Sequence, residues 1–174
     1  SKPVRLIVPF PPGGGNDIIA RAVGQELAKP LGQQVVIDNR AGAGGTLGAA
    51  VAAKGGADGY TLLFHDIASH CISATLYAKL PYDPLKDFEP IAVVAGSPMV
   101  LIAHPSLGVR NLPQLVQLAK SKPGQIVYAS SGVGAITHLG PVRLNRLTGM
   151  QMQHVPFKGS VPAAASVISG ETAI

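Results

Sequence analysis

The chain has 174 residues, enough for one domain or for two small ones. Hydrophobic residues make up 47% and charged residues 13%, which excludes a disordered chain. The formal net charge is +5, but Lys and Arg are scattered and only 5% of residues are aromatic, which argues against a nucleic-acid partner. No apolar run reaches the roughly 18 residues of a membrane span. Cys71 is the single cysteine, so an intramolecular disulfide is excluded.

The first part of the chain predicts strands that alternate with helices. A buried strand at 4–9 leads into a glycine loop, and a helix follows that Asn16 or Gly15 caps and that Pro30 and Gly32 end. The same order returns with a strand, a glycine loop, a short helix and a further strand, at 33–40, 41–45, 46–54 and 60–66.

The middle of the chain is less regular. Residues 67–90 contain several prolines and poor periodicity, so a loop-like excursion is expected there. Two short apolar runs, 91–95 and 99–104, are predicted as strands.

The last part of the chain repeats the order of strand, glycine loop and helix. A helix at 111–124 has Asn111 as its cap and Pro113 in its first turn. The later strands are expected at 125–130 and 152–157, the helices at 136–149 and 163–170, and a strand begins at 171–174. This alternation predicts a parallel, doubly wound α/β architecture in two similar lobes, 1–100 and 101–174.

Four glycine- or serine-bearing loops follow strands and open helices, at 11–16, 40–46, 130–136 and 157–161. The N-terminus of a helix offers unpaired N–H groups and partial positive charge, so each loop is a candidate anion site. A tight turn is the simpler interpretation of any one of them. Two such loops in matching positions favour a clamp on a small carboxylate, with Arg40 as the best placed cationic partner.

A nucleotide site is the alternative interpretation of the first loop. A P-loop needs Gly-Lys-Ser/Thr, but Asn16 follows Gly15 here. The dinucleotide fingerprint is matched at Gly13 and Gly15 and broken at Ile18, while Asp38 could act as the ribose-binding acid. A nucleotide-dependent α/β enzyme therefore stays open.

Other catalytic and metal motifs are weak. Ser69, His70 and Cys71 are contiguous, whereas a nucleophile and its base are normally distant in sequence. His65, Asp66 and His70 lack the spacing of helical metal ligands. We therefore expect no catalytic residue, no metal and no cofactor.

Six stretches together resemble the periplasmic solute-binding proteins of tripartite tricarboxylate transporters, the Bug or TctC family. They are VRLIVPFPPGGGNDIIAR, VVIDNRAGAGGTLGA, ADGYTLLF, LPYDPLKDFEPIA, YASSGVGAITHL and HVPFKGS. Their order along nearly the whole chain makes the resemblance specific.

The resemblance implies a two-lobed Venus-flytrap fold of type II-like topology, incomplete in this chain because family members have roughly 300 residues. It implies export to the periplasm, with the signal peptide absent from this chain. It also implies capture of a small mono- or dicarboxylate, or an amino-acid-like ligand, between the lobes for delivery to membrane transporter subunits, without enzymatic activity. A sensor lobe that presents the same ligand to a signalling partner is a further alternative.

The resemblance also implies a set of ligand-binding residues in loops of both lobes. They are Phe10, Pro12, Gly13, Gly14, Gly15, Asn16, Asp17, Gly44, Gly45, Thr46, Ser69 and His70 in the first lobe, and Ser131, Gly132, Gly134, Ala135, Thr137 and His138 in the second.

Overall fold

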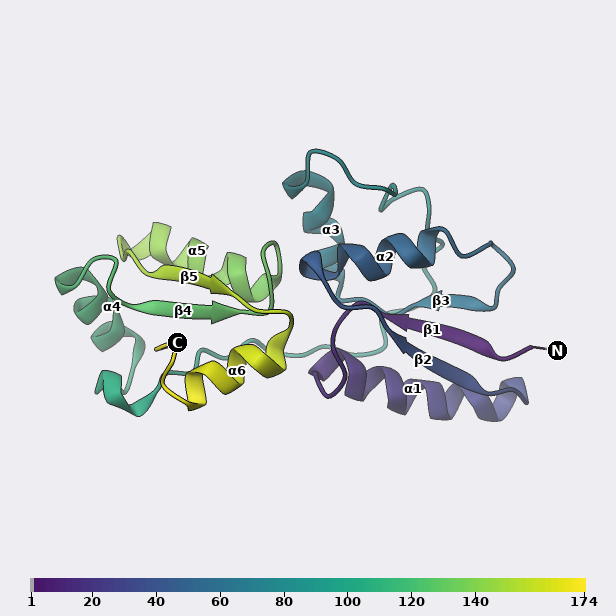
Figure 1. The fold of residues 1–174 in the computed structure, drawn as a ribbon, viewed down its shortest axis with the longest axis horizontal. Helices are drawn as coiled ribbons and strands as arrows, with labels where there is room; N and C mark the ends of the chain where they lie inside the picture. Colours follow the sequence, from purple (N-terminus) through teal and green to yellow (C-terminus); the bar gives the residue numbers. More distant parts are fainter. Residues whose placement is uncertain (1) are drawn as a thin grey trace. The chain divides into compact units, whose positions relative to one another are not determined.

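The computed structural model describes residues 2–174 and divides the chain into two compact units, Ser1–Gly96 and Ser97–Ile174 (Figure 1). The sequence suggested a boundary after residue 100, and the division in the structure falls slightly earlier, after Gly96. Both units are α/β, as expected.

The first unit contains a three-stranded parallel sheet in the order β2-β1-β3 (Figure 1). Its elements in chain order are β1 (Val4–Val8), α1 (Gly15–Leu31), β2 (Val35–Asn39), a 3-10 turn (Ala43–Gly45), α2 (Thr46–Ala53), β3 (Thr61–Leu63) and α3 (Ile67–Leu76).

The central strand β1 is buried on both faces of this sheet. Leu6 and Val8 pack with Ala20 of α1, while Ile7, whose side chain points the other way, is fully buried as well. The helices α1 and α2 lie on opposite sides of the sheet (Figure 1). A strand covered on both faces explains the continuous apolar run at 4–9.

The second unit contains a parallel pair of strands, β4 and β5. Its elements are a 3-10 turn (Pro105–Leu107), α4 (Leu112–Ser121), β4 (Val127–Ser130), α5 (Ile136–Thr148), β5 (Gln153–Pro156) and α6 (Ser160–Ile168). The helices α5 and α6 lie on opposite sides of the strand pair (Figure 1). The buried core is formed by Leu115, Ala119, Ile126, Tyr128, Met150, Met152 and Ile174.

One helix end differs from the sequence prediction and two agree with it. Gly14, not Asn16 or Gly15, is the residue at the N-terminal cap of α1, and no side chain caps that helix. The predicted end of α1 is confirmed at Gly32, the C-terminal cap with a φ of 59°, while Pro30 lies inside the last turn. The predicted cap of α4 is confirmed, because the Asn111 side chain accepts a hydrogen bond from the N–H of Gln114 at 3.0 Å.

The loop expected at 67–90 begins with a helix, α3, so that prediction was wrong over 67–76. The carboxylate of Asp66 accepts a hydrogen bond from the N–H of Ser69 at 2.8 Å and caps this helix. The prolines that suggested a loop all follow the helix.

The strands expected at 91–95 and 99–104 do not form, and the apolar side chains of Ile91, Val93 and Val100 are about four-fifths exposed. A strand needs a hydrogen-bonding neighbour, and among residues 2–174 neither segment has a ladder partner. Residues 171–174 are not assigned as a strand either, although Ala173 and Ile174 form backbone hydrogen bonds with β4. None of the helices among the described residues has the length and apolar character needed to cross a membrane.

Candidate functional site

The loop between β1 and α1 is held together by the carboxylate of Asp17. This carboxylate accepts hydrogen bonds from the N–H of Gly13, from Arg21 Nε and from Asn39 Nδ2, each at 2.9 Å. Asn39 Nδ2 also donates to the carbonyl of Phe10 at 3.0 Å. Asp17 is 2% exposed, and the hydrogen bond from Arg21 is the main cause that lowers its pKa to about 2. A carboxylate of the protein itself therefore lies at the N-terminal end of α1.

The other residues predicted in this loop differ in exposure. Pro12, Gly13 and Gly15 are exposed, while Gly14 is buried at the cap of the helix. A Cβ added to Gly15 would meet no atom within 4 Å, so the space beside the first turn of α1 is open.

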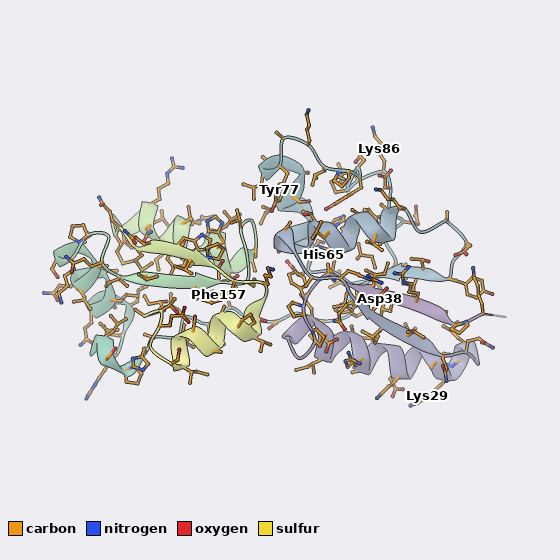
Figure 2. All side chains as sticks on the ribbon, in the orientation of Figure 1. Lys29, Asp38, His65, Tyr77, Lys86 and Phe157 are labelled. Carbon is orange, nitrogen blue, oxygen red and sulfur yellow. The ribbon has the colours of Figure 1, made fainter. Side chains whose placement is uncertain are left out.

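Asp38, the candidate ribose-binding acid, is engaged in ion pairs on the sheet of the first unit (Figure 2). It accepts hydrogen bonds from Arg5 Nε at 2.7 Å and pairs with Arg40 Nε at 2.8 Å. Burial alone would raise the pKa of Asp38, but the hydrogen bonds from Arg5 and Arg40 outweigh it and lower the pKa. Arg40, favoured from the sequence as a cationic partner for a ligand, is therefore already paired.

A row of aromatic rings lies beside the first loop. The ring of Phe10 contacts that of His65 edge-on at 5.6 Å, and His65 contacts His70 edge-on at 5.3 Å. Gly45 allows this packing, because a Cβ there would lie 2.7 Å from His65 Nε2. Burial is the main cause that lowers the pKa of His65, whose side chain is 6% exposed. The row contains two predicted site residues, Phe10 and His70, together with His65, which the sequence suggested only as a weak metal ligand.

Two polar atoms in this region are buried without a hydrogen-bond partner, Ser69 Oγ and His70 Nδ1. His70 Nε2 lies 3.0 Å from the carbonyl oxygen of Pro84. Because a carbonyl only accepts, the neutral ring carries its proton on Nε2, and Nδ1 remains an acceptor. A buried polar group without a partner costs free energy until water or a ligand satisfies it.

The second glycine loop is closed by its own hydrogen bonds. Gly44, Gly45 and Thr46 are buried, and the Thr46 hydroxyl donates to the carbonyl of Ala43 at 2.9 Å. The Tyr77 hydroxyl donates to the same carbonyl at 3.1 Å. These residues shape the region around His65 through their backbone.

Neutral groups hold the loop between β4 and α5. Thr137 Oγ1 accepts a hydrogen bond from the N–H of Ser131 at 3.0 Å and lies 2.7 Å from Ser131 Oγ. The N–H of Gly134, which has a φ of 84°, donates to His138 Nδ1 at 3.3 Å. The first turn of α5 contains no acidic residue. Partial positive charge at this end of α5 is therefore not compensated within the helix.

His154 lies next to this loop, and the sequence did not point to it. Its ring stacks on that of His138, with centroids 4.1 Å apart, and Ser130 Oγ lies 2.6 Å from His154 Nε2. The hydroxyl of Ser130 also accepts a hydrogen bond from the N–H of Gly132 at 3.1 Å. The pairing of β4 with β5 brings Ser130 and His154 together, and the position of α5 beside the strands adds His138.

Charge is distributed unequally between the two units. Up to Gly96 the sequence has eight Lys and Arg against eight Asp and Glu, and from Ser97 it has six against one. The formal charge of +5 therefore belongs entirely to the second unit. Among residues 2–174, every ion pair lies in the first unit. Within the same part of the chain, no three His, Cys, Asp or Glu side chains come together to hold a metal ion.

Comparison with known proteins gives these loops a context. The profile of the tripartite tricarboxylate transporter family receptor, TctC, matches residues 19–174. The protein BugT of Bordetella pertussis is 38% identical over 174 residues, which make up 99% of this chain and 53% of BugT. The chain thus spans about half the length of the curated relatives it matches.

Solved structures agree with this match. A protein of R. palustris with adipate is 35% identical with a TM-score of 0.95, and MatC from Rhodopseudomonas palustris with bound malate is 34% identical with a TM-score of 0.92. The periplasmic binding protein BugD is 32% identical with a TM-score of 0.91. Each match covers 99% of this chain and 57% or 58% of the solved one. The two units therefore have the two-lobed α/β fold of periplasmic binding proteins, of which the chain covers a part, and the chain belongs to the TctC family of tripartite tricarboxylate transporter receptors.

Proposed function

We propose that the chain is the ligand-binding part of a periplasmic receptor that captures a small carboxylate and delivers it to the membrane subunits of a tripartite tricarboxylate transporter. Family membership supports a receptor rather than an enzyme. One similar solved structure is that of a protein with adipate and another is that of a protein with bound malate, and both compounds are dicarboxylates. The ligand of this chain is therefore proposed to be a mono- or dicarboxylate of that size.

The observation that carries the proposal is the loop at 131–138. It opens a helix with no acid in its first turn, and neutral hydroxyl and imidazole groups hold it. A ligand carboxylate gains there from N–H groups and from the helix dipole. The surrounding unit carries the whole net charge of +5, and such a field raises the encounter rate with anions.

The first unit has a different part in the proposal. Asp17 already places a negative charge at the N-terminus of α1, so a ligand carboxylate would be repelled there. Phe10, Ser69 and His70 instead offer an aromatic edge and two polar atoms without partners. The Phe10 ring suits the apolar body of the ligand, and the polar atoms of Ser69 and His70 suit an uncharged or second polar end.

The nucleotide alternative loses its main support in the first unit. Asp38 would have to accept hydrogen bonds from a ribose, but both Arg5 and Arg40 are paired with it. Among residues 2–174, the acid near the end of β2 and both cations beside it are therefore already paired and do not favour a dinucleotide.

A thermal-shift screen of the full chain tests the proposal. Adipate, malate and other small carboxylates are compared with NAD and ATP, and a ligand at 100 times its Kd adds about 2.7 kcal/mol of stability. We expect a shift with at least one carboxylate and none with the nucleotides. A shift with a nucleotide alone would contradict the receptor and favour the enzyme.

A pair of threonine variants locates the binding. Thr137→Val keeps the side-chain volume and removes the hydroxyl that holds Ser131, so we expect the Kd for the carboxylate to rise about tenfold. Thr172→Val removes a buried hydroxyl of the same unit that bonds to Ser166 Oγ at 2.8 Å, away from the loop. This control should leave the Kd unchanged. Equal affinity in the two variants would contradict a role for the loop.

A further inference from the structure

Three rings form a continuous stack in the second unit. The strand register places Tyr128 of β4 directly opposite His154 of β5, and their rings stack at 5.0 Å between centroids. The ring of His138, from α5, also stacks on the His154 ring, with 4.1 Å between the centroids and 25° between the ring planes. The stack therefore links the strand pair β4 and β5 to the first turn of α5.

A buried hydroxyl anchors the middle ring of the stack, His154. Ser130 is 1% exposed, and its Oγ lies 2.6 Å from His154 Nε2. The same oxygen accepts a hydrogen bond from the N–H of Gly132 at 3.1 Å. Tyr128, 2% exposed, closes the other face of the His154 ring. Two contacts therefore fix the position of the His154 ring, the one with Ser130 Oγ and the one with the Tyr128 ring.

The hydrogen bonds of His138 determine which of its nitrogens carries the proton. The N–H of Gly134 donates to Nδ1 at 3.3 Å, and a backbone N–H only donates. The neutral ring must therefore be protonated at Nε2. Among residues 2–174, Nε2 has no hydrogen-bond partner, so it is a donor available to a ligand.

We propose that His154, anchored by Ser130, is a positioning residue that holds the His138 ring with Nδ1 toward Gly134 and Nε2–H free to donate to a ligand carboxylate. The part that concerns the ligand rests on the proposed function. Neutral rings suit this role, because burial lowers the pKa of both histidines and His138 lowers that of His154 further. The rings of His138 and His154 face each other, and the Tyr128 ring also stacks on His154.

The protonation pattern can be measured without any ligand. Long-range proton–nitrogen NMR spectra of the 15N-labelled full chain distinguish the two neutral forms of each imidazole. We expect His138 to show protonation at Nε2 near neutral pH. A His138 protonated at Nδ1, or an even mixture, would overturn the inference even if the protein bound carboxylates well.

Substitutions then test the role of His154. In His154→Leu and in Ser130→Ala we expect a mixture of the two forms at His138 and about a tenfold rise in the Kd for the carboxylate. His154→Phe keeps a flat ring for stacking, and it should retain more of the Nε2 form than His154→Leu does. Should His154→Leu leave both the His138 spectrum and the Kd unchanged, the positioning role would be wrong.

A histidine outside the stack provides the control. His104 lies in the same unit and bonds to Ser106 Oγ at 2.7 Å, so His104→Gln should change neither the His138 spectrum nor the Kd. A wild-type chain that shows the expected Nε2 form but binds no carboxylate would overturn the proposed function and the ligand-facing role together. The two failures are therefore distinguishable.

Discussion

The two units build the same succession of strand, glycine loop and helix, yet they hold their loops with different chemistry. In the first unit the carboxylate of Asp17 binds the loop N–H of Gly13 and the side chain of Arg21. In the second unit Thr137 and His138 hold the loop as neutral groups. One helix N-terminus is thus compensated from within, and the other remains able to attract an anion.

The net charges of the units follow the same difference. The first unit balances its charges and forms ion pairs, while the second has six cationic residues against one acid. A glycine loop before a helix is therefore not enough to identify an anion site. The groups that already occupy its N–H donors decide whether a ligand can.

The largest effect is expected from Gly48→Ala, which should destabilise the first unit and leave the second unit folded. A Cβ at Gly48 would lie 2.6 Å from Pro9 Cβ and 2.8 Å from the carbonyl oxygen of Arg40. Backbone atoms cannot yield as a flexible side chain can, so Gly48→Ala should cost about 3 kcal/mol or more. Hydrogen exchange should rise across residues 4–63 and stay unchanged across 112–168.

Gly56→Ala is the matched control for this variant, because a Cβ at Gly56 would meet no atom within 4 Å. Equal loss of protection in both units after Gly48→Ala would show that they do not unfold separately.

The next largest effect is the loss of stability at low pH that follows from protonation of Asp17. Because the pKa of Asp17 is lowered to about 2 from 3.8, its contribution to stability is complete above pH 4 and is lost as the pH falls toward 2. Asp17→Asn should cost up to about 2 kcal/mol at pH 7 and should make unfolding less dependent on pH between 4 and 2. Urea unfolding at several pH values measures both effects.

The same variant sharpens the comparison of the loops. Asp17→Asn should not weaken carboxylate binding, because it removes a negative charge from the first loop. A Kd that rises as far as it does in Thr137→Val would mean that the first loop, too, is a main anion contact.

Helix caps give a smaller effect that is similar in the two units. Asp66 caps α3 and Asn111 caps α4 through one backbone hydrogen bond each. Substitution of either residue by alanine should cost about 1 kcal/mol. Hydrogen exchange should show the change within the affected helix, and a change spread over both units would contradict a local role.

The smallest effect concerns a surface ion pair. Lys29 and Glu26, near the end of α1 (Figure 2 labels Lys29), are 70% and 73% exposed. Lys29→Ala should change the free energy of unfolding by less than about 0.5 kcal/mol. A thermal melt with a loss beyond that limit would show that the surface pairs of the first unit do more than balance its charge.

Much of this architecture could be predicted from the sequence, because it depends on local patterns. The structure confirms the strand predicted from the apolar run at 4–9, the cap at Asn111 and the helices that follow the glycine loops. The helix α3 was missed because the prolines that follow it obscured the cap at Asp66. The strands at 91–95 and 99–104 were predicted wrongly, since local propensity does not supply a ladder partner.

The contacts that distinguish the two loops could not be predicted in this way. Arg40 looked available for a ligand until the structure placed it beside Asp38. His154 gave no motif, because its contacts exist only in the fold. Ser130, 24 residues away, reaches it across the strand pair, and His138 reaches it from α5. A glycine loop before a helix can be recognised in the sequence, whereas the partners of the helix's first N–H groups are known only from the fold.

The most direct test of this account is an NMR titration of the 15N-labelled full chain with adipate and with malate, following every backbone amide. We predict the largest chemical-shift changes at 131–138, with smaller ones at 10–17 and 65–70. The largest shifts at 13–17, with little change at 131–138, would contradict the claim that the second unit receives the carboxylate.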